Sequence, residues 1–197
     1  MNIKLYITDE GEENLKNFKY KGGSVGLSYD YIWSPFAQFL VNYIPKWWAP
    51  NAITFVGFIL VIIGEIIVYS TGRLGDPLSN AQLLIFSILI FVYQTLDNID
   101  GKQARRTGTS TALGMLMDHG CDAMSCYFLC NCVVRIVGIT DEKLALYGTF
   151  TVLFIFYLSV WAQYYSNGVM SLGKVNAVDD GIPAVYCLAL LTIFTGQ

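Results

Sequence analysis

Charged residues are scarce in this chain of 197 residues, where they make up 14% of the positions, against 54% for hydrophobic residues. The mean hydropathy is correspondingly high, at +0.48. Soluble domains rarely have this composition. The sequence also lacks an internal repeat or a low-complexity segment. The scarcity of charge therefore indicates an integral membrane protein.

A secretory signal peptide is not visible, because residues 1–21 carry four acidic side chains and no apolar core. The cysteines show neither a zinc framework nor a disulfide pattern. One is Cys187, and the other four fall within a single apolar stretch, namely Cys121, Cys126, Cys130 and Cys132. Small side chains such as Cys126 and Cys130 favour close packing between helices.

Five apolar runs predict membrane-spanning helices, at residues 52–70, 81–96, 112–139, 144–165 and 182–194. The first four have a convincing length, and the fifth is short. We expect the second helix to continue past Leu96. The predicted fold class is an all-α, polytopic membrane helix bundle. The fifth helix is then either the last one or part of a longer bundle.

The residues before the first span divide into two parts. Residues 1–30 are polar and charged, which predicts a flexible cytosolic leader. Residues 31–48 predict an N-terminal interfacial amphipathic helix, with a core-packing helix as the alternative. Its apolar side chains recur at helical spacing, namely Phe36, Phe39, Leu40, Tyr43, Ile44 and Trp47. Residues 49–197 form the predicted membrane domain.

Basic residues predict the orientation of the bundle. Nine of them flank the expected helix ends on one side, at Lys4, Lys16, Lys19, Lys21, Lys46, Lys102, Arg105, Arg106 and Lys174. Only Arg73, Arg135 and Lys143 flank the other side. Because basic residues are enriched on the cytoplasmic side, we expect the N-terminus and the ends around Lys102 to face the cytosol.

Four aspartates stand where a bilayer disfavours charge: Asp97, Asp100, Asp118 and Asp122. Each costs several kcal/mol in a membrane helix, roughly 2.5 to 3.5 on insertion scales, unless a ligand compensates it. The first two are three residues apart and the last two are four apart, so each pair shares one helix face. Asp97 and Asp100 alone also fit a solvated loop or helix caps. The other pair fits that interpretation poorly, because it lies inside an apolar run.

The residues between the two pairs allow the chain to reverse. Residues 107–111 are turn-forming and include Gly108. The two helices would then pack antiparallel, and the carboxylates of one helix would face those of the other. Oxygen ligands suit two hard divalent cations, Mg²⁺ or Mn²⁺, and two-metal sites serve phosphoryl chemistry. Another acid, Glu65, lies about 21 Å along the first span from Asn51 and is interpreted as structural.

The run D-N-I-D-G-K-Q-A-R that starts at Asp97, followed by Gly114, Asp118 and Asp122, resembles the signature of the CDP-alcohol phosphotransferases. The flanking runs G-K-Q-A-R-R and D-H-G-C-D are similar to the choline and ethanolamine phosphotransferase branch. This resemblance implies transfer of phosphocholine or phosphoethanolamine from the CDP-alcohol to diacylglycerol, with release of CMP. A phosphatidylinositol-type synthase is the alternative within the family.

The resemblance also implies roles for individual residues. The four aspartates would bind the two metal ions. The nucleotide and its phosphates would be bound by Asn51, Gly101, Lys102, Arg105 and Gly114, although Asn51 also fits a plain helix cap. Asp122 is the family's usual candidate for the general base. His119, the only histidine, is the alternative base or a neighbour that assists.

Met115 departs from the resemblance, because the choline and ethanolamine branch commonly has glutamate at this position. A non-catalytic relative is therefore a second hypothesis, and a membrane prenyltransferase is a third, disfavoured because its aspartate motifs lie far apart in the chain. The expected partners are CDP-choline or CDP-ethanolamine, diacylglycerol, membrane lipid and a second copy in a homodimer, with no nucleic acid. The expected location is the endoplasmic reticulum or Golgi membrane, with the active site facing the cytosol.

Overall fold

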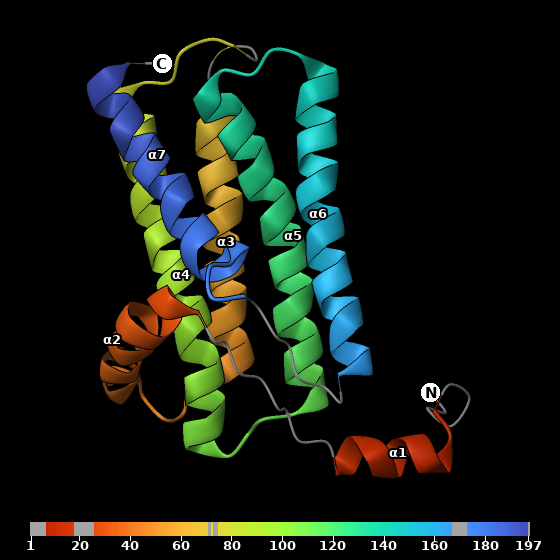
Figure 1. The fold of residues 1–197 in the computed structure, drawn as a ribbon. Coiled ribbons are helices and arrows are strands. Elements are labelled where there is room, and N and C mark those ends of the chain that lie inside the picture. Colours follow the sequence, from red (N-terminus) through yellow and green to blue (C-terminus); the bar gives the residue numbers. More distant parts are fainter. Residues whose placement is uncertain (1–6, 18–25, 71, 73–74, 167–172, 197) are drawn as a thin grey trace.

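The computed structural model describes residues 7–17, 26–70, 72, 75–166 and 173–196. These residues form helices and connecting turns, with no strand among them. Four helices cross the length of the molecule, and a fifth follows a short π-helical turn (Figure 1). Their bounds are α3 Pro50–Tyr69, α4 Asn80–Thr107, α5 Ala112–Val137, α6 Glu142–Tyr165, η4 Ala177–Gly181 and α7 Ile182–Thr195.

The predicted all-α membrane bundle is confirmed. Five helices are long and apolar enough to cross a bilayer, and η4 with α7 forms the fifth of them, over Ala177–Thr195. The second helix does continue past Leu96, as far as Thr107. The chain then reverses at Gly108, which adopts a left-handed conformation with φ 68°, and Thr111 caps the start of α5. This turn brings α5 back antiparallel to α4.

The core lies between α3, α4, α5 and α7, which contact one another in the order α5, α3, α4, α7, with α5 also touching α7. Two glycines let α3 approach α4 closely. A Cβ atom on Gly57 would lie 3.3 Å from the Tyr93 ring, and one on Gly64 would lie 3.3 Å from the Phe86 ring. Small residues at such interfaces are typical of membrane helices. The outer helix α6 packs mainly on α5.

The segment before α3 is helical over Tyr29–Tyr43, as η2 Tyr29–Trp33, α2 Ser34–Leu40 and η3 Val41–Tyr43. The helix thus begins two residues before the predicted 31–48 segment and ends five residues earlier, because Pro45 holds Ile44 in an extended conformation, with ψ 127°. One face is core-packed, with Ala37 and Val41 each 1% exposed. The other face leaves Phe39 and Tyr43 exposed, and its interfacial position stays a prediction.

Two side chains of α4 hold this segment against the bundle. The guanidinium of Arg106 donates to the carbonyl oxygens of Val41 and Ile44, the latter at 2.8 Å. The amide of Gln103 donates to the carbonyls of Pro45, at 2.9 Å, and Trp48, at 3.2 Å. The Val41 and Pro45 carbonyls also accept backbone hydrogen bonds, from Ile44 and Trp48, so the two side chains add donors where the helix ends.

The predicted leader contains a short helix, α1 Asp9–Lys16, which is capped by Thr8 and buries none of its residues. Residues 1–6 and 18–25 of the leader lie outside the described part of the chain. Its flexibility stays a prediction. In the membrane domain, the carboxylate of Glu65 accepts a hydrogen bond from Asn131 of α5 at 3.1 Å. This contact supports the interpretation of Glu65 as a structural acid paired within the bundle.

Candidate metal and nucleotide site

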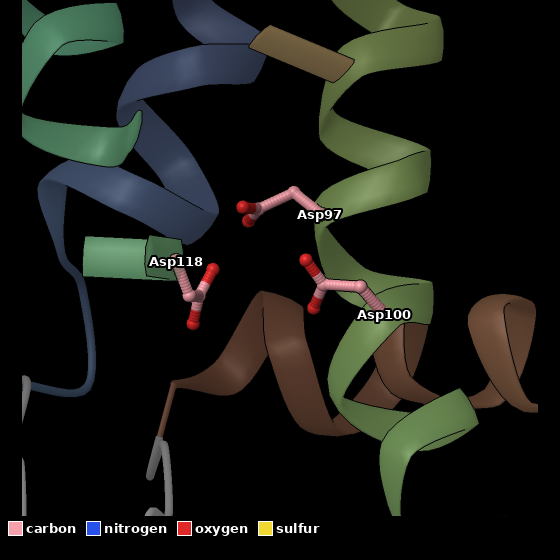
Figure 2. A group of neighbouring side chains, drawn as sticks. All are labelled: Asp97, Asp100 and Asp118. Carbon is pink, nitrogen blue, oxygen red and sulfur yellow. The ribbon is translucent and has the colours of Figure 1, made fainter. Parts of the chain in front are cut away.

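Three of the four predicted aspartates converge between α4 and α5. One carboxylate oxygen from each of Asp97, Asp100 and Asp118 lies within 4.8 Å of the other two. Figure 2 shows Asp97 and Asp100 reaching from α4 toward Asp118, which comes from α5. The antiparallel arrangement that follows the Gly108 turn therefore brings the two helix faces together. A set of three converging carboxylates fits a hard divalent cation.

The fourth aspartate, Asp122, lies one turn beyond Asp118 on α5 and is not part of that group of three. Its carboxylate lies beside that of Asp97. The hydroxyl of Tyr93 donates to it at 3.3 Å. Asp122 is thus placed next to the candidate metal site with one oxygen already oriented by a neighbouring side chain.

A hydroxyl group from α3 orients Asp100. Pro50 begins this helix, where its missing N–H costs nothing, and Thr54 follows one turn later. The hydroxyl of Thr54 donates to the Asp100 carboxylate, and both side chains are buried. Since a charged acceptor strengthens a hydrogen bond, this contact fixes the orientation of the Asp100 carboxylate.

A pocket opens beside the three carboxylates, where the ends of α3, α4 and α5 meet. It contains four of the five residues that the resemblance assigns to the nucleotide. Its lining consists of Pro50, Asn51, Thr54, Asp100, Gly101, Ala104, Arg105, Thr109, Ser110, Thr111, Gly114, Met115 and Asp118. The pocket therefore combines carboxylates, a guanidinium group and polar groups near two helix starts, which suits a phosphorylated ligand bridged by cations.

Two glycines keep this pocket open. A Cβ atom on Gly114 would lie 3.4 Å from both the Asn51 amide oxygen and the Thr111 hydroxyl. A Cβ atom on Gly101 would lie 3.4 Å from a guanidinium nitrogen of Arg105. Each glycine thus leaves room at the point where polar side chains line the pocket.

Two predicted site residues lie elsewhere. The amine of Lys102 donates to the Ser34 hydroxyl at 2.9 Å and lies 5.7 Å from the centre of the Tyr29 ring. It therefore contacts the segment before α3 and is not among the residues that line the pocket. His119 follows Asp118 on α5, is half-buried and is likewise not among the lining residues.

Sequence reasoning missed Asp179, which lies in η4 and is 4% exposed. Its charge adds a small repulsion at Asp97, weaker than the repulsion from Asp122 or Asp118. Asn176 caps η4 and donates to an Asp179 oxygen at 2.7 Å. The signal was an Asn-x-x-Asp pattern immediately before an apolar run, which is typical of a helix start. Tyr93 was also missed, although it lies one turn before Asp97.

Comparison with known proteins identifies the family. Residues 47–195 match the CDP-alcohol phosphatidyltransferase family. The chain is 34% identical over 194 residues to an uncharacterized CDP-alcohol phosphatidyltransferase class-I family protein 1 of Dictyostelium discoideum, covering 98% of this chain and 50% of that protein.

Two named relatives are enzymes by their descriptions. The choline/ethanolaminephosphotransferase 2 of Arabidopsis thaliana is 32% identical over 196 residues, which cover 97% of this chain and 49% of that protein. The cholinephosphotransferase 1 of Danio rerio is 38% identical over 162 residues, which cover 81% of this chain and 42% of that protein. The chain therefore spans about half the length of the curated relatives it matches.

Proposed function

The chain belongs to the CDP-alcohol phosphatidyltransferase family, and on this premise we propose that it transfers phosphocholine or phosphoethanolamine from the CDP-alcohol to diacylglycerol. One observation carries the proposal. Asp97, Asp100 and Asp118 converge within 4.8 Å, directly beside a pocket lined by Asn51 and Arg105. A diphosphate needs both features, since its phosphates bind through cations and its nucleoside needs a polar cleft.

The donor set fits a pair of divalent cations. Carboxylate oxygens are ligands that Mg²⁺ and Mn²⁺ prefer, and four nearby aspartates balance the charge of two such ions. We propose that Asp97, Asp100 and Asp118 hold them, with Asp122 as the fourth ligand. Two bound ions would orient the diphosphate and stabilise the charge that develops on the leaving CMP.

The proposed reaction is a substitution at the phosphorus that carries the alcohol. The diacylglycerol hydroxyl oxygen forms a bond to this phosphorus, and the bond to the oxygen shared with the cytidine phosphate breaks. CMP leaves with that oxygen. Asn51 and Gly114 would border the nucleotide, and the Arg105 guanidinium would donate to its phosphate oxygens.

The acceptor hydroxyl must lose a proton, and Asp122 is the proposed base. Its carboxylate is oriented by the Tyr93 hydroxyl at 3.3 Å and adjoins the group of three carboxylates. His119 is the alternative base. It lies beside Asp118 in sequence but points away from that residue's face by about 100°.

We also propose the setting in which this reaction occurs. The ends of α4 and α5 that carry the site would face the cytosol, because they adjoin the more basic side of the chain. A soluble CDP-alcohol reaches the site from that side. The membrane would be that of the endoplasmic reticulum or Golgi, and the protein would form a homodimer.

Met115 favours a second candidate function. It lines the pocket beside Asp118, where a thioether can neither accept a proton from the acceptor nor bind a cation of this kind strongly. A relative that binds the nucleotide without turnover would retain every other pocket feature. The experiment below separates the two candidates.

The test uses the chain reconstituted into vesicles that contain diacylglycerol, with labelled CDP-choline or CDP-ethanolamine and Mg²⁺ or Mn²⁺. We expect labelled phospholipid from the wild type and from Asp30→Asn, an exposed carboxylate outside the site, and none from Asp122→Ala. Equal product from wild type and Asp122→Ala would refute the proposed site. CMP binding without product, with product gained in Met115→Glu, would establish the non-catalytic candidate.

A further inference from the structure

A buried lysine lies on a side of α4 that does not line the nucleotide pocket, where α2 packs against the end of this helix (Figure 1). This residue is Lys102, whose side chain is 9% exposed. We infer that its ammonium group, together with the Ser34 hydroxyl, binds the phosphate group of a membrane phospholipid. The site is separate from the aspartates and from the pocket, so the inference goes beyond the proposed function and does not depend on it.

The neighbours of Lys102 leave part of its hydrogen-bonding capacity unused. An ammonium group carries three N–H donors. Among the described residues, Lys102 donates to the Ser34 hydroxyl at 2.9 Å, and the centre of the Tyr29 ring lies 5.7 Å from its nitrogen. Two other side chains of α4 find more acceptors in the segment before α3, since Gln103 and Arg106 each donate to two backbone carbonyls. Lys102 therefore keeps donors that a ligand can use.

The charge of Lys102 has no carboxylate partner within the part of the chain that the structure describes. The charged side chain that acts on it is that of Arg105, one turn along α4, and this effect is repulsive. A lysine that is mostly covered is rarely left without an anionic partner, because its charge has lost much of its solvation. An anion at this point would be attracted by both basic side chains. The electrostatics therefore point to an anionic ligand.

The depth of Lys102 in the bundle suits the phosphate groups of a bilayer. Lys102 lies five residues before Thr107, the last residue of α4, which corresponds to about 8 Å along the helix. This end of α4 belongs to the more basic side of the chain, which we predict to face the cytosol. Lipid phosphates lie at that boundary, and lysine side chains near helix ends reach toward them.

The segment that contacts Lys102 also offers apolar side chains to the tails of a lipid. Tyr31, Ile32 and Phe39 of η2 and α2 are all more than half exposed. Exposed apolar side chains of this kind gain free energy from contact with acyl chains, and a free phosphate ion would make no use of them. A phospholipid would be bound by its phosphate at Lys102 and by its tails along these side chains. The combination favours a lipid over a soluble anion.

The test measures how much lipid the purified chain retains in detergent with EDTA, by native mass spectrometry. The probes are dioctanoyl phosphatidylglycerol, which carries an anionic phosphate, and dioctanoylglycerol, which has the same tails without a phosphate. We expect the wild type to retain phosphatidylglycerol in preference to dioctanoylglycerol. Lys102→Met should weaken the binding of phosphatidylglycerol roughly 5- to 30-fold. Lys46→Met removes an exposed charge from the same basic side of the chain and should bind this lipid as the wild type does.

Thermal unfolding separates lipid binding from a structural role of Lys102. Methionine keeps the length of the apolar stem and removes a charge that has no anionic partner, so Lys102→Met should be at least as stable as the wild type without lipid. Phosphatidylglycerol should raise the unfolding midpoint of the wild type and of Lys46→Met, and that of Lys102→Met much less. A less stable Lys102→Met with unchanged lipid retention would show that the lysine is structural, and would overturn the inference.

Competition identifies the ligand and its place. Equal retention of the two lipids by the wild type would contradict a phosphate site. Inorganic phosphate that displaces phosphatidylglycerol at matched concentration would show that the ligand is a free anion instead of a lipid. Displacement by CMP with Mn²⁺ would place the lipid in the nucleotide pocket and would likewise refute the proposed site. Because retention is measured without nucleotide or metal, a chain that lacks transferase activity can still pass this test.

Discussion

The convergence of three carboxylates makes a direct prediction about stability. Without a cation, Asp97, Asp100 and Asp118 repel one another at separations within 4.8 Å. Two unit charges at 4.8 Å repel each other by about 3.5 kcal/mol at an effective dielectric constant near 20. Asp118→Asn keeps the shape of the side chain and removes one of these charges. We therefore expect the metal-free variant to be more stable than the metal-free wild type, by roughly 1 to 3 kcal/mol.

Cations should reverse this order. An ion present at a hundred times its dissociation constant stabilises the folded state by about 2.7 kcal/mol. For a chain of this size, that corresponds to a rise of roughly 5 to 11 °C in the unfolding midpoint. The wild type should show this rise when Mn²⁺ or Mg²⁺ is added after EDTA, and Asp118→Asn should show little of it.

The assay is thermal unfolding in detergent, followed by tryptophan fluorescence, with and without the cation. Asp30→Asn is the matched control, because Asp30 is an exposed carboxylate outside the site. It should respond to the cation as the wild type does. An equal rise in wild type and Asp118→Asn would show that the ion binds elsewhere, and a less stable metal-free Asp118→Asn would refute the repulsion argument.

Substitutions at two further positions test the pocket and the packing of the segment that precedes α3. Gly114→Ala should weaken CMP binding and Gly114→Leu should weaken it further, since a Cβ atom at this position would lie 3.4 Å from the Asn51 side chain. The control Gly148→Ala should bind CMP normally, because its added Cβ atom would meet nothing within 4 Å. Equal CMP binding by all these variants would contradict the assigned pocket. Arg106→Met should lower the free energy of unfolding by about 1 to 3 kcal/mol, because the Ile44 carbonyl loses the guanidinium donor and the Val41 carbonyl is left with the backbone N–H of Ile44. Chemical denaturation measures this loss, and the exposed Arg105→Met should show none.

The membrane helices were predictable because the bilayer imposes a simple rule on composition and length. The extension of α4 to Thr107 was predictable as well, since polar residues there keep helical spacing and Gly108 provides the stop. The end of the helix before α3 was not predicted at Tyr43. Apolar spacing continued to Trp47, but Pro45 fixes the preceding backbone in an extended form regardless of that spacing.

The convergence of the aspartates at the candidate site was predictable where these residues are close in sequence. Asp97, Asp100 and Asp118 lie on two helices joined by a short turn, so helical spacing alone brings them together. Asp179 lies on η4, which α5 and α6 separate from α4 in the sequence. No local pattern relates this residue to the aspartates of α4. Lys102 was predicted to bind the nucleotide from its place in the signature, but the sequence did not reveal that its amine contacts Ser34.

The four aspartates lie at two depths along α4 and α5, measured from the turn that joins these helices. From the turn at Gly108, Asp100 and Asp118 come first on α4 and α5, and both line the nucleotide pocket. Asp97 and Asp122 follow about one turn deeper, roughly 5 to 6 Å further into the bundle, beside Tyr93. In the proposed reaction, CMP would occupy the pocket at the shallow end of the site, and Asp122, the proposed base, would act from its deeper end.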